Sequence, residues 1–309
     1  MKIWVAVTDK SWYEYLSRLE PDEINFWQPS GSQSFRVLTP GELFLFKLHS
    51  PHNCIVGGGH FVRYSALPAS LAWEAFERKN GVASFADLRV RIQRYRKGEM
   101  PLDPIIGCNV LAEPFFLPPD KWIAAPGDWS SNIVKGKTYE STAPEGRRLL
   151  DLLHRAAPPN RDLRDAATPA DVTDVARYGA DYLTRGRLGQ GTFRVLVTDA
   201  YARRCAVTGE KTLPVLEAAH IKAFASLGPN RVNNGVLLRS DLHKLFDLGY
   251  VTVTPELRLE VSARLREDWE NGRDYYAHHG KPLRVRPADS ASWPAKEYLE
   301  WHNEHVFKA

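Results

Sequence analysis

The fold can be inferred from one stretch, which reads Glu217-Ala218-Ala219-His220-Ile221, then Asn233-Asn234-Gly235, then Asp241-Leu242-His243-Lys244-Leu245-Phe246-Asp247. Residues 214–221 have the composition of a strand that ends near His220, and residues 235–238 form a second short apolar run. His243 and Asp247 are four positions apart, so both can lie on one face of a helix. The stretch therefore predicts a strand, a loop, a second strand and a helix.

The polar residues of this stretch suit the hydrolysis of a phosphodiester. A neutral imidazole with a pKa of about 6.5 can take a proton from an attacking water molecule. A divalent cation can stabilise the charge on phosphorus and on the departing oxygen. Either histidine alone is explained more simply as a packing or surface residue. The ordered set of His220, Asn234 and His243 within its flanking sequence favours a nuclease.

Further stretches on both sides support this interpretation. They are Gly189-Gln190-Gly191-Thr192-Phe193-Arg194, Arg204-Cys205-Ala206-Val207-Thr208-Gly209, Gly235-Val236-Leu237-Leu238-Arg239 and Tyr298-Leu299-Glu300-Trp301-His302. Together they resemble the HNH branch of bacterial modification-dependent restriction endonucleases, which have the ββα-metal fold. The resemblance implies that His220 is the general base and that Asn234 orients the loop and the base. It also implies that His243 is catalytic and binds the metal.

Two positions depart from the family pattern. Many HNH sites have a metal-binding aspartate just before the base, where this chain has Ala219. Glu217 or Asp247 can replace it, so the predicted metal ligands are His243, Asp247 and Glu217. The predicted ion is magnesium (Mg²⁺), Mn²⁺ or another divalent cation. Paired cysteines are lacking, so no structural zinc is expected, and Cys205 is predicted to be a buried apolar residue.

The composition is that of a soluble globular protein with room for two domains. The chain has 309 residues, a 43% hydrophobic share, a 25% charged share and a net charge of +4, which permits DNA binding. Its 3 cysteines are far apart, which argues against a disulfide framework and for a reducing compartment. No signal peptide or long apolar segment is recognisable, so we expect a cytoplasmic protein without membrane contact.

The chain is predicted to have an α+β fold in three parts. Residues 1–140 read as a β-rich domain, in which the triple glycine at 57–59 indicates a bulge or a close backbone approach. Residues 141–184 read as a helical and proline-rich linker, with helical spacing of leucines at 145–155. Residues 185–309 form the predicted HNH nuclease domain.

The first domain opens with Lys2-Ile3-Trp4-Val5-Ala6-Val7-Thr8 and is rich in tryptophan. It resembles the PUA superfamily, which includes EVE, ASCH, YTH and SRA modules, and this implies a β-barrel-like domain that reads a flipped modified base. The candidates for stacking on the base are Trp27 and Trp129. The candidates for hydrogen bonding to its polar edge are Asn25 and Gln28. Candidate contacts to the DNA backbone are Arg89, Arg94 and Arg194. Alternatively, the tryptophans fill a core and the arginines form a solvated helix face.

These features predict a modification-dependent DNA restriction endonuclease. Its partner would be double-stranded DNA that carries a modified base such as 5-methyl- or 5-hydroxymethylcytosine. One HNH unit cuts one strand, so a homodimer or two successive nicks would be needed for a double-strand break. One alternative is an HNH endonuclease whose first domain binds DNA sequence-specifically or non-specifically. Another is a catalytically inactive nucleic-acid-binding module, and a secreted toxin nuclease is a weaker third.

Overall fold

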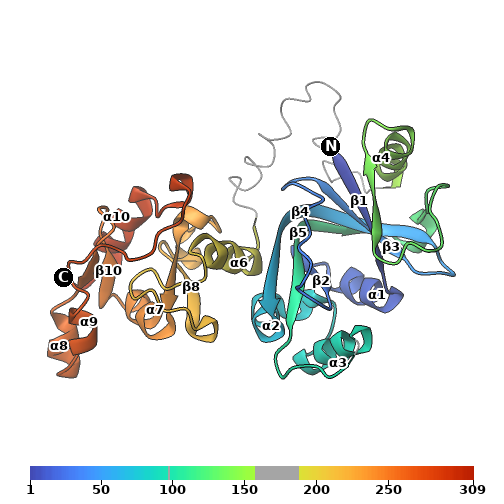
Figure 1. The fold of residues 1–309 in the computed structure, drawn as a ribbon. Helices are drawn as coiled ribbons and strands as arrows, with labels where there is room; N and C mark the ends of the chain where they lie inside the picture. Colours follow the sequence, from blue (N-terminus) through green and yellow to red (C-terminus); the bar gives the residue numbers. More distant parts are fainter. Residues whose placement is uncertain (97, 157–187) are drawn as a thin grey trace. The chain divides into compact units, whose positions relative to one another are not determined.

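The computed structural model of the protein describes residues 1–96, 98–156 and 188–309. The chain divides into two compact units, Met1–Arg185 and Gly186–Ala309. Both units combine helices and strands (Figure 1), so the predicted α+β class is confirmed. The proline-rich part of the predicted linker, residues 157–184, lies outside the described residues. Among the described helices, none is long and apolar enough to cross a membrane.

The first unit is built on one mixed sheet. Its strands are β1 (Lys2–Thr8), β2 (Glu23–Gln28), β3 (Leu43–Leu48), β4 (Cys54–Pro68), β5 (Ile105–Phe116), β6 (Ile123–Ala124) and β7 (Gly136–Glu140). The strand order is β2-β5-β4-β3-β1-β7, and β6 pairs with β4. β1 runs parallel to β3 and antiparallel to β7. The described pairings do not join β2 to β7, so the sheet is an open path.

Helices cover both faces of this sheet. They are α1 (Lys10–Leu19), α2 (Ala69–Phe76), α3 (Phe85–Tyr95) and α4 (Pro144–Ala156), with a 3-10 turn η1 (Glu77–Asn80) after α2. Trp12 and Leu16 of α1 pack with Phe46 in one buried cluster. Leu149 of α4 packs with Val5 in another. Each face of the sheet therefore has its own apolar cover.

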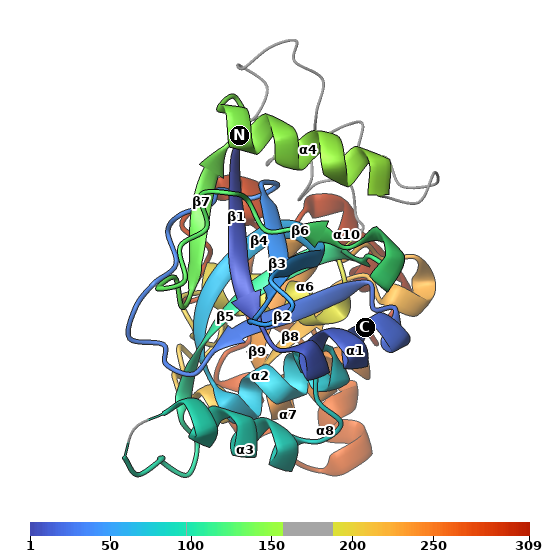
Figure 2. The same cartoon turned by 90° about the vertical axis from the view of Figure 1, so that its right-hand side faces the viewer.

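Helix α4 packs in the core of the first unit. The sequence places its residues in the linker, whereas α4 lies beside β1 and β7 in Figure 2. Leu149 and Leu153 are each 2% exposed and belong to the core of the first unit. The spacing of its leucines predicts an apolar helix face, but it does not tell which surface that face covers.

The glycines of β4 fit the predicted close approach. The pairing of β4 with β5 shifts register between Gly58 and His60, which marks an irregularity in the ladder. A Cβ atom at Gly58 would lie 2.8 Å from Phe44 O and 2.7 Å from Leu45 Cδ2. Glycine is therefore needed for β3 and β4 to approach this closely.

Phe46 is expected to be essential for the stability of the first unit. Its ring is fully buried, stacks on Phe26 at 5.9 Å and meets Trp12 edge-on at 5.1 Å. Phe46→Ala should lower the free energy of unfolding by about 3–5 kcal/mol because it leaves a cavity. Denaturant unfolding of the full chain, followed by tryptophan fluorescence, measures this loss. Val90→Ala, at a side chain that is 70% exposed, is the control and should change stability by about 0.5 kcal/mol or less.

The second unit contains the predicted strand, loop, strand and helix. Its elements are α6 (Gln190–Ala200), β8 (Leu216–His220), β9 (Gly235–Arg239), α7 (Ser240–Asp247), β10 (Val251–Val253), β11 (Leu259–Val261), α8 (Arg264–Trp269), α9 (Arg273–Tyr276) and α10 (Lys296–His305). β8 and β9 pair antiparallel, with His220 opposite Gly235. α7 follows β9 directly, and both α6 and α7 contact this hairpin (Figure 1).

Candidate active site

His220 is the last residue of β8, and its imidazole is held from two directions. The ring stacks on Phe193 of α6, with 3.8 Å between centroids and 11° between planes. Its Nε2 lies 2.8 Å from Asn230 Oδ1. Burial is the main cause that lowers the pKa of His220, and the charge of His243 acts in the same direction, while Asn230 and Asp247 oppose it. A neutral imidazole at pH 7 is suited to accept a proton.

Asn234 lies immediately before β9 and is fully buried. Its Oδ1 accepts a hydrogen bond from Lys222 N at 2.9 Å. Its Nδ2 donates to Lys222 O at 3.0 Å and to Pro229 O at 2.9 Å. The amide thus fastens both ends of the loop that follows His220, and these contacts go to loop backbone rather than to the imidazole.

His243 lies in α7 between two carboxylates. Its Nδ1 is 2.6 Å from Glu217 Oε2 of β8, and its Nε2 is 3.4 Å from Asp247 Oδ2, one turn further along α7. His243 and Asp247 both act on the pKa of His220 through their charges. The hairpin and α7 therefore bring His243 and Asp247 within electrostatic reach of His220, and Glu217 contacts the His243 ring.

The arrangement around His243 limits how a cation could be held. Within the described parts of the chain, no group of three or more His, Cys, Asp or Glu residues is placed to hold one metal ion. Glu217 and Asp247 approach different nitrogens of the His243 ring. The two carboxylates can have different roles. Asp247 and His243 could bind a cation together, while Glu217 accepts the other N–H of the His243 ring, as a carboxylate normally does beside a metal-binding histidine. In this arrangement His243 Nε2 and Asp247 would hold the ion, and Glu217 would orient the ring.

The candidate base contacts of the first unit are placed in different surroundings. Asn25 is fully buried, and its Nδ2 donates to Asn80 Oδ1 at 2.9 Å. Trp27 donates from Nε1 to Asn80 O at 3.0 Å. Trp129 instead packs with the cluster that contains α4, and the Nζ of Lys47 lies 4.8 Å from its ring centre. The structure brings Asn25 and Trp27 together, and it places Trp129 apart from them.

The remaining candidates are partly exposed. Gln28 is half-buried at the end of β2. Arg89 of α3 donates a hydrogen bond to Leu102 O, and Arg94 is exposed beside the ring of Tyr95. Arg194 is half-buried in α6. The two arginines of α3 belong to the first unit and Arg194 to the second, so the predicted backbone contacts do not form one patch on a single unit.

Two polar residues of interest were not among the candidates. Asn230 contacts His220, and its only sequence signal is its position in the loop between His220 and Asn234. Asn109 of β5 is fully buried, and its Oδ1 has no hydrogen-bond partner among the described residues. The Oδ1 of Asn25 is in the same situation. Buried acceptors of this kind cost free energy, so they are unusual in a packed sheet.

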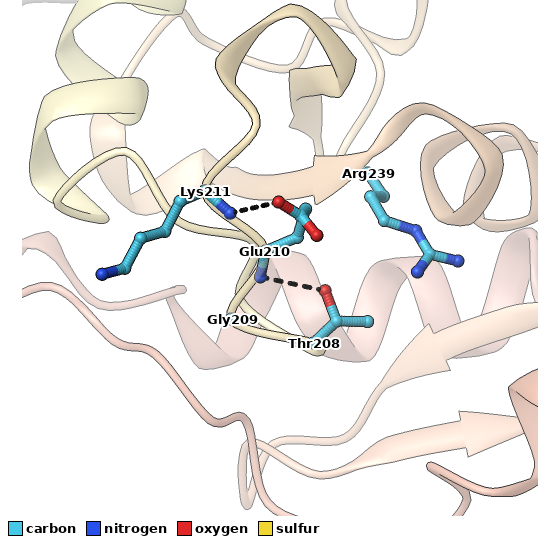
Figure 3. A pocket seen from close by; sticks show the side chains of 5 residues that line it. All are labelled: Thr208, Gly209, Glu210, Lys211 and Arg239. Atoms are coloured by element: carbon cyan, nitrogen blue, oxygen red, sulfur yellow. Dashed lines mark hydrogen bonds between the residues drawn. The ribbon is translucent and has the colours of Figure 1, made fainter.

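A pocket with a volume of about 310 Å³ lies elsewhere in the second unit (Figure 3). Its lining residues are Thr208, Gly209, Glu210, Lys211 and Arg239. Arg239 pairs with Leu216, at the end of the β8–β9 hairpin opposite His220. Neither histidine is among the residues that line the pocket. Beside it, the buried Cys205 accepts a hydrogen bond at Sγ from Thr208 N, which fits the predicted structural role of this cysteine.

Comparison with known proteins identifies the region around the two histidines. The family model described as HNH endonuclease matches residues 205–254, which contain His220, Asn234, His243 and both carboxylates. No curated protein sequence matches the chain.

Three solved structures show partial similarity. The modification-dependent TagI restriction endonuclease is 22% identical with a TM-score of 0.29, and the match covers 37% of each chain. An ASCH protein from Zymomonas mobilis is 8% identical with a TM-score of 0.36, over 49% of this chain and 99% of that one. The type IV phosphorothioation-dependent restriction endonuclease ScoMcrA is 15% identical with a TM-score of 0.20, over 78% of this chain and 48% of that one. At such TM-scores these structures do not define the fold.

The family match and the strand–loop–strand–helix arrangement agree on the same residues. Residues 205–254 of this chain form an HNH endonuclease domain.

Proposed function

We propose that the protein is a modification-dependent DNA endonuclease. The second unit hydrolyses phosphodiester bonds, and the first unit binds double-stranded DNA that carries a modified cytosine, 5-methyl or 5-hydroxymethyl. The observation that carries this proposal is the pairing of a neutral, fixed imidazole at His220 with the His243 and Asp247 pair in one environment. A base for water and a binding site for a divalent cation are the two requirements of the reaction.

His220 acts on the attacking water. The imidazole takes one proton from water as the water oxygen forms a bond to phosphorus. The bond from phosphorus to the 3′ oxygen breaks, and this oxygen takes a proton from solvent, which leaves a 5′-phosphate and a 3′-hydroxyl. Asn234 holds the loop after His220 by three hydrogen bonds, so that the ring keeps its position during the reaction.

His243 and Asp247 would hold the cation, and Glu217 would keep the His243 ring in place. One imidazole nitrogen and one carboxylate would leave room for water and phosphate oxygens, which are ligands that Mg²⁺ uses with phosphate substrates. When bound, the ion neutralises charge that develops on phosphorus and on the departing oxygen. Mn²⁺ and other divalent cations can supply the same chemistry.

The first unit contributes a base-reading surface around β2. Asn25 and Trp27 are two positions apart in one strand, so they share a face of the sheet. The unpartnered Oδ1 of Asn25 can accept a hydrogen bond from the exocyclic amine of cytosine, and Trp27 can stack on the base. Because Asn25 is fully buried, the neighbouring turn η1 must move before a base can reach it.

Matched plasmids test the modification dependence. The purified chain with Mg²⁺ should cut a plasmid that carries 5-methyl- or 5-hydroxymethylcytosine about 10- to 200-fold faster than the same plasmid without it, since recognition of one small substituent contributes this much. Gel analysis of nicked and linear products measures the rate and shows whether one or both strands are cut.

Two outcomes would contradict parts of the proposal. Equal cutting of both plasmids would exclude modification dependence and favour a first unit that simply binds DNA. The absence of cutting on every substrate, with retained DNA binding, would identify the chain as a nucleic-acid-binding module. Trp27→Ala should reduce the preference for the modified plasmid, and Trp269→Ala, at an exposed residue of the second unit, is the control.

A further inference from the structure

The hydrogen bonds of Asn230 determine which nitrogen of His220 carries the proton. Asn230 is 5% exposed, and its Nδ2 donates to Leu188 O at 2.5 Å. Its Oδ1 therefore faces His220 Nε2, at 2.8 Å. An amide oxygen only accepts hydrogen bonds, so Nε2 of His220 must be the donor. Rotating the amide by 180° would set its oxygen against Leu188 O, where two acceptors would repel each other.

We propose that Asn230 is a positioning residue that holds His220 in the tautomer protonated at Nε2, so that Nδ1 is the atom that accepts the proton of the attacking water. This inference rests on the proposed function of His220 as the base. Because a neutral imidazole carries one proton, fixing it at Nε2 leaves the lone pair at Nδ1. The stacked ring of Phe193 sets the plane of the imidazole. The hydrogen bond to Asn230 determines which ring nitrogen faces the Asn230 side chain.

An amide is better suited to this task than a carboxylate. The charged and titratable groups that act on His220 are His243 and Asp247, and burial of the ring disfavours its charged form. Asn230 fixes the tautomer without adding a negative charge, which would stabilise the imidazolium. The base therefore stays neutral near pH 7 while its orientation is fixed.

The tautomer can be measured directly on the full chain. Nitrogen-15 NMR of the imidazole groups distinguishes protonated from unprotonated ring nitrogens. The His220 signals, among those of the 10 histidines, are those absent from the spectrum of His220→Ala. We expect a protonated Nε2 and an unprotonated Nδ1 at pH 7.5. The opposite tautomer, or a mixture of both, would overturn the inference. This result does not depend on DNA cleavage, so it is separate from any failure of the proposed function.

Two substitutions test the role in catalysis on the plasmid that the wild type cuts. Asn230→Asp loses the donor to Leu188 O but keeps an acceptor towards His220 and adds a charge, so the acidic limb of the rate profile should move to higher pH by about one to three units. Asn230→Leu removes the acceptor, so the maximal rate should fall on the order of 10²-fold or more as the tautomer is lost.

The pH profile separates positioning from a merely structural role. If both variants lose activity by the same factor with an unchanged profile, Asn230 only supports the loop and the inference fails. Asn271→Asp, at an exposed asparagine of the same unit, is the matched control and should leave the profile unchanged. If neither variant folds, the wild-type NMR spectrum still decides.

Discussion

Replacing His220 with alanine is expected to lower the rate of DNA cleavage by about 10²–10⁴-fold, the contribution of a positioned general base. DNA binding should stay unchanged, because the His220 ring contacts Phe193 and Asn230 rather than forming an exposed charged surface. A rate above one tenth of the wild type would exclude His220 as the base. Single-turnover cleavage measures the rate, and a binding titration in Ca²⁺ measures affinity. His305→Ala, at an exposed histidine of α10, is the control.

The pH dependence of the wild type follows from the same residue. His220 acts in its neutral form, and burial lowers its pKa below the ordinary value of 6.5. The rate should therefore be constant at and above pH 7 and fall only as the pH drops below 6.5, when the imidazole gains a proton. A fall that begins at pH 7.5 or higher would show that another group, or a charged His220, limits the reaction.

Replacing His243 with alanine should reduce cleavage by about 10³-fold, because a bound cation contributes several kcal/mol and about 1.4 kcal/mol corresponds to a tenfold change. Asp247→Asn should lower the apparent affinity for Mg²⁺, because Asp247 faces the same nitrogen, Nε2, as the proposed ion. Glu217→Gln should have a smaller effect, about 10–100-fold, because it only orients the ring. Cleavage rates measured over a range of Mg²⁺ concentrations distinguish the three variants.

The ranking of these variants is the critical result. If Glu217→Gln weakens Mg²⁺ binding more than Asp247→Asn does, Glu217 itself binds the ion and the role of the two carboxylates is reversed. Asp268→Asn, a carboxylate that accepts from Tyr250 and lies outside this group, is the matched control. Full activity without any divalent cation would remove the metal from the proposal.

The sequence predicts the nuclease unit well because its structure is local. β8, β9 and α7 are successive regular elements separated by one loop, and each has a clear apolar pattern within a few residues. The positions of His220, Asn234 and His243 on these elements could therefore be inferred before their contacts were known. Asn230 could not, because it lies in an irregular loop where no periodicity indicates the direction of a side chain.

The first unit was harder to predict because its contacts are distant in sequence. The spacing of the leucines indicates the apolar face of α4, but the cluster that this face joins also contains Ile3 and Val5, at the other end of the unit. Asn25 alternates with Ile24 and Phe26, and this pattern alone favours an accessible side chain, yet η1, about 50 residues later in the chain, covers it. The alternation along a strand indicates on which face of the sheet a side chain lies, but not which element covers that face.

The contacts around the two imidazoles join residues that are close in sequence, and this affects how the nuclease unit can be combined with other domains. His220 and Asn230 are 10 residues apart, and His243 and Glu217 are 26 apart, whereas a buried hydrogen bond of the first unit joins residues 104 apart. A segment whose contacts are close in sequence can fold quickly and depends little on distant parts of the chain. A segment of this kind can be combined with different recognition domains, because the contacts described for its two histidines all lie between Leu188 and Asp247.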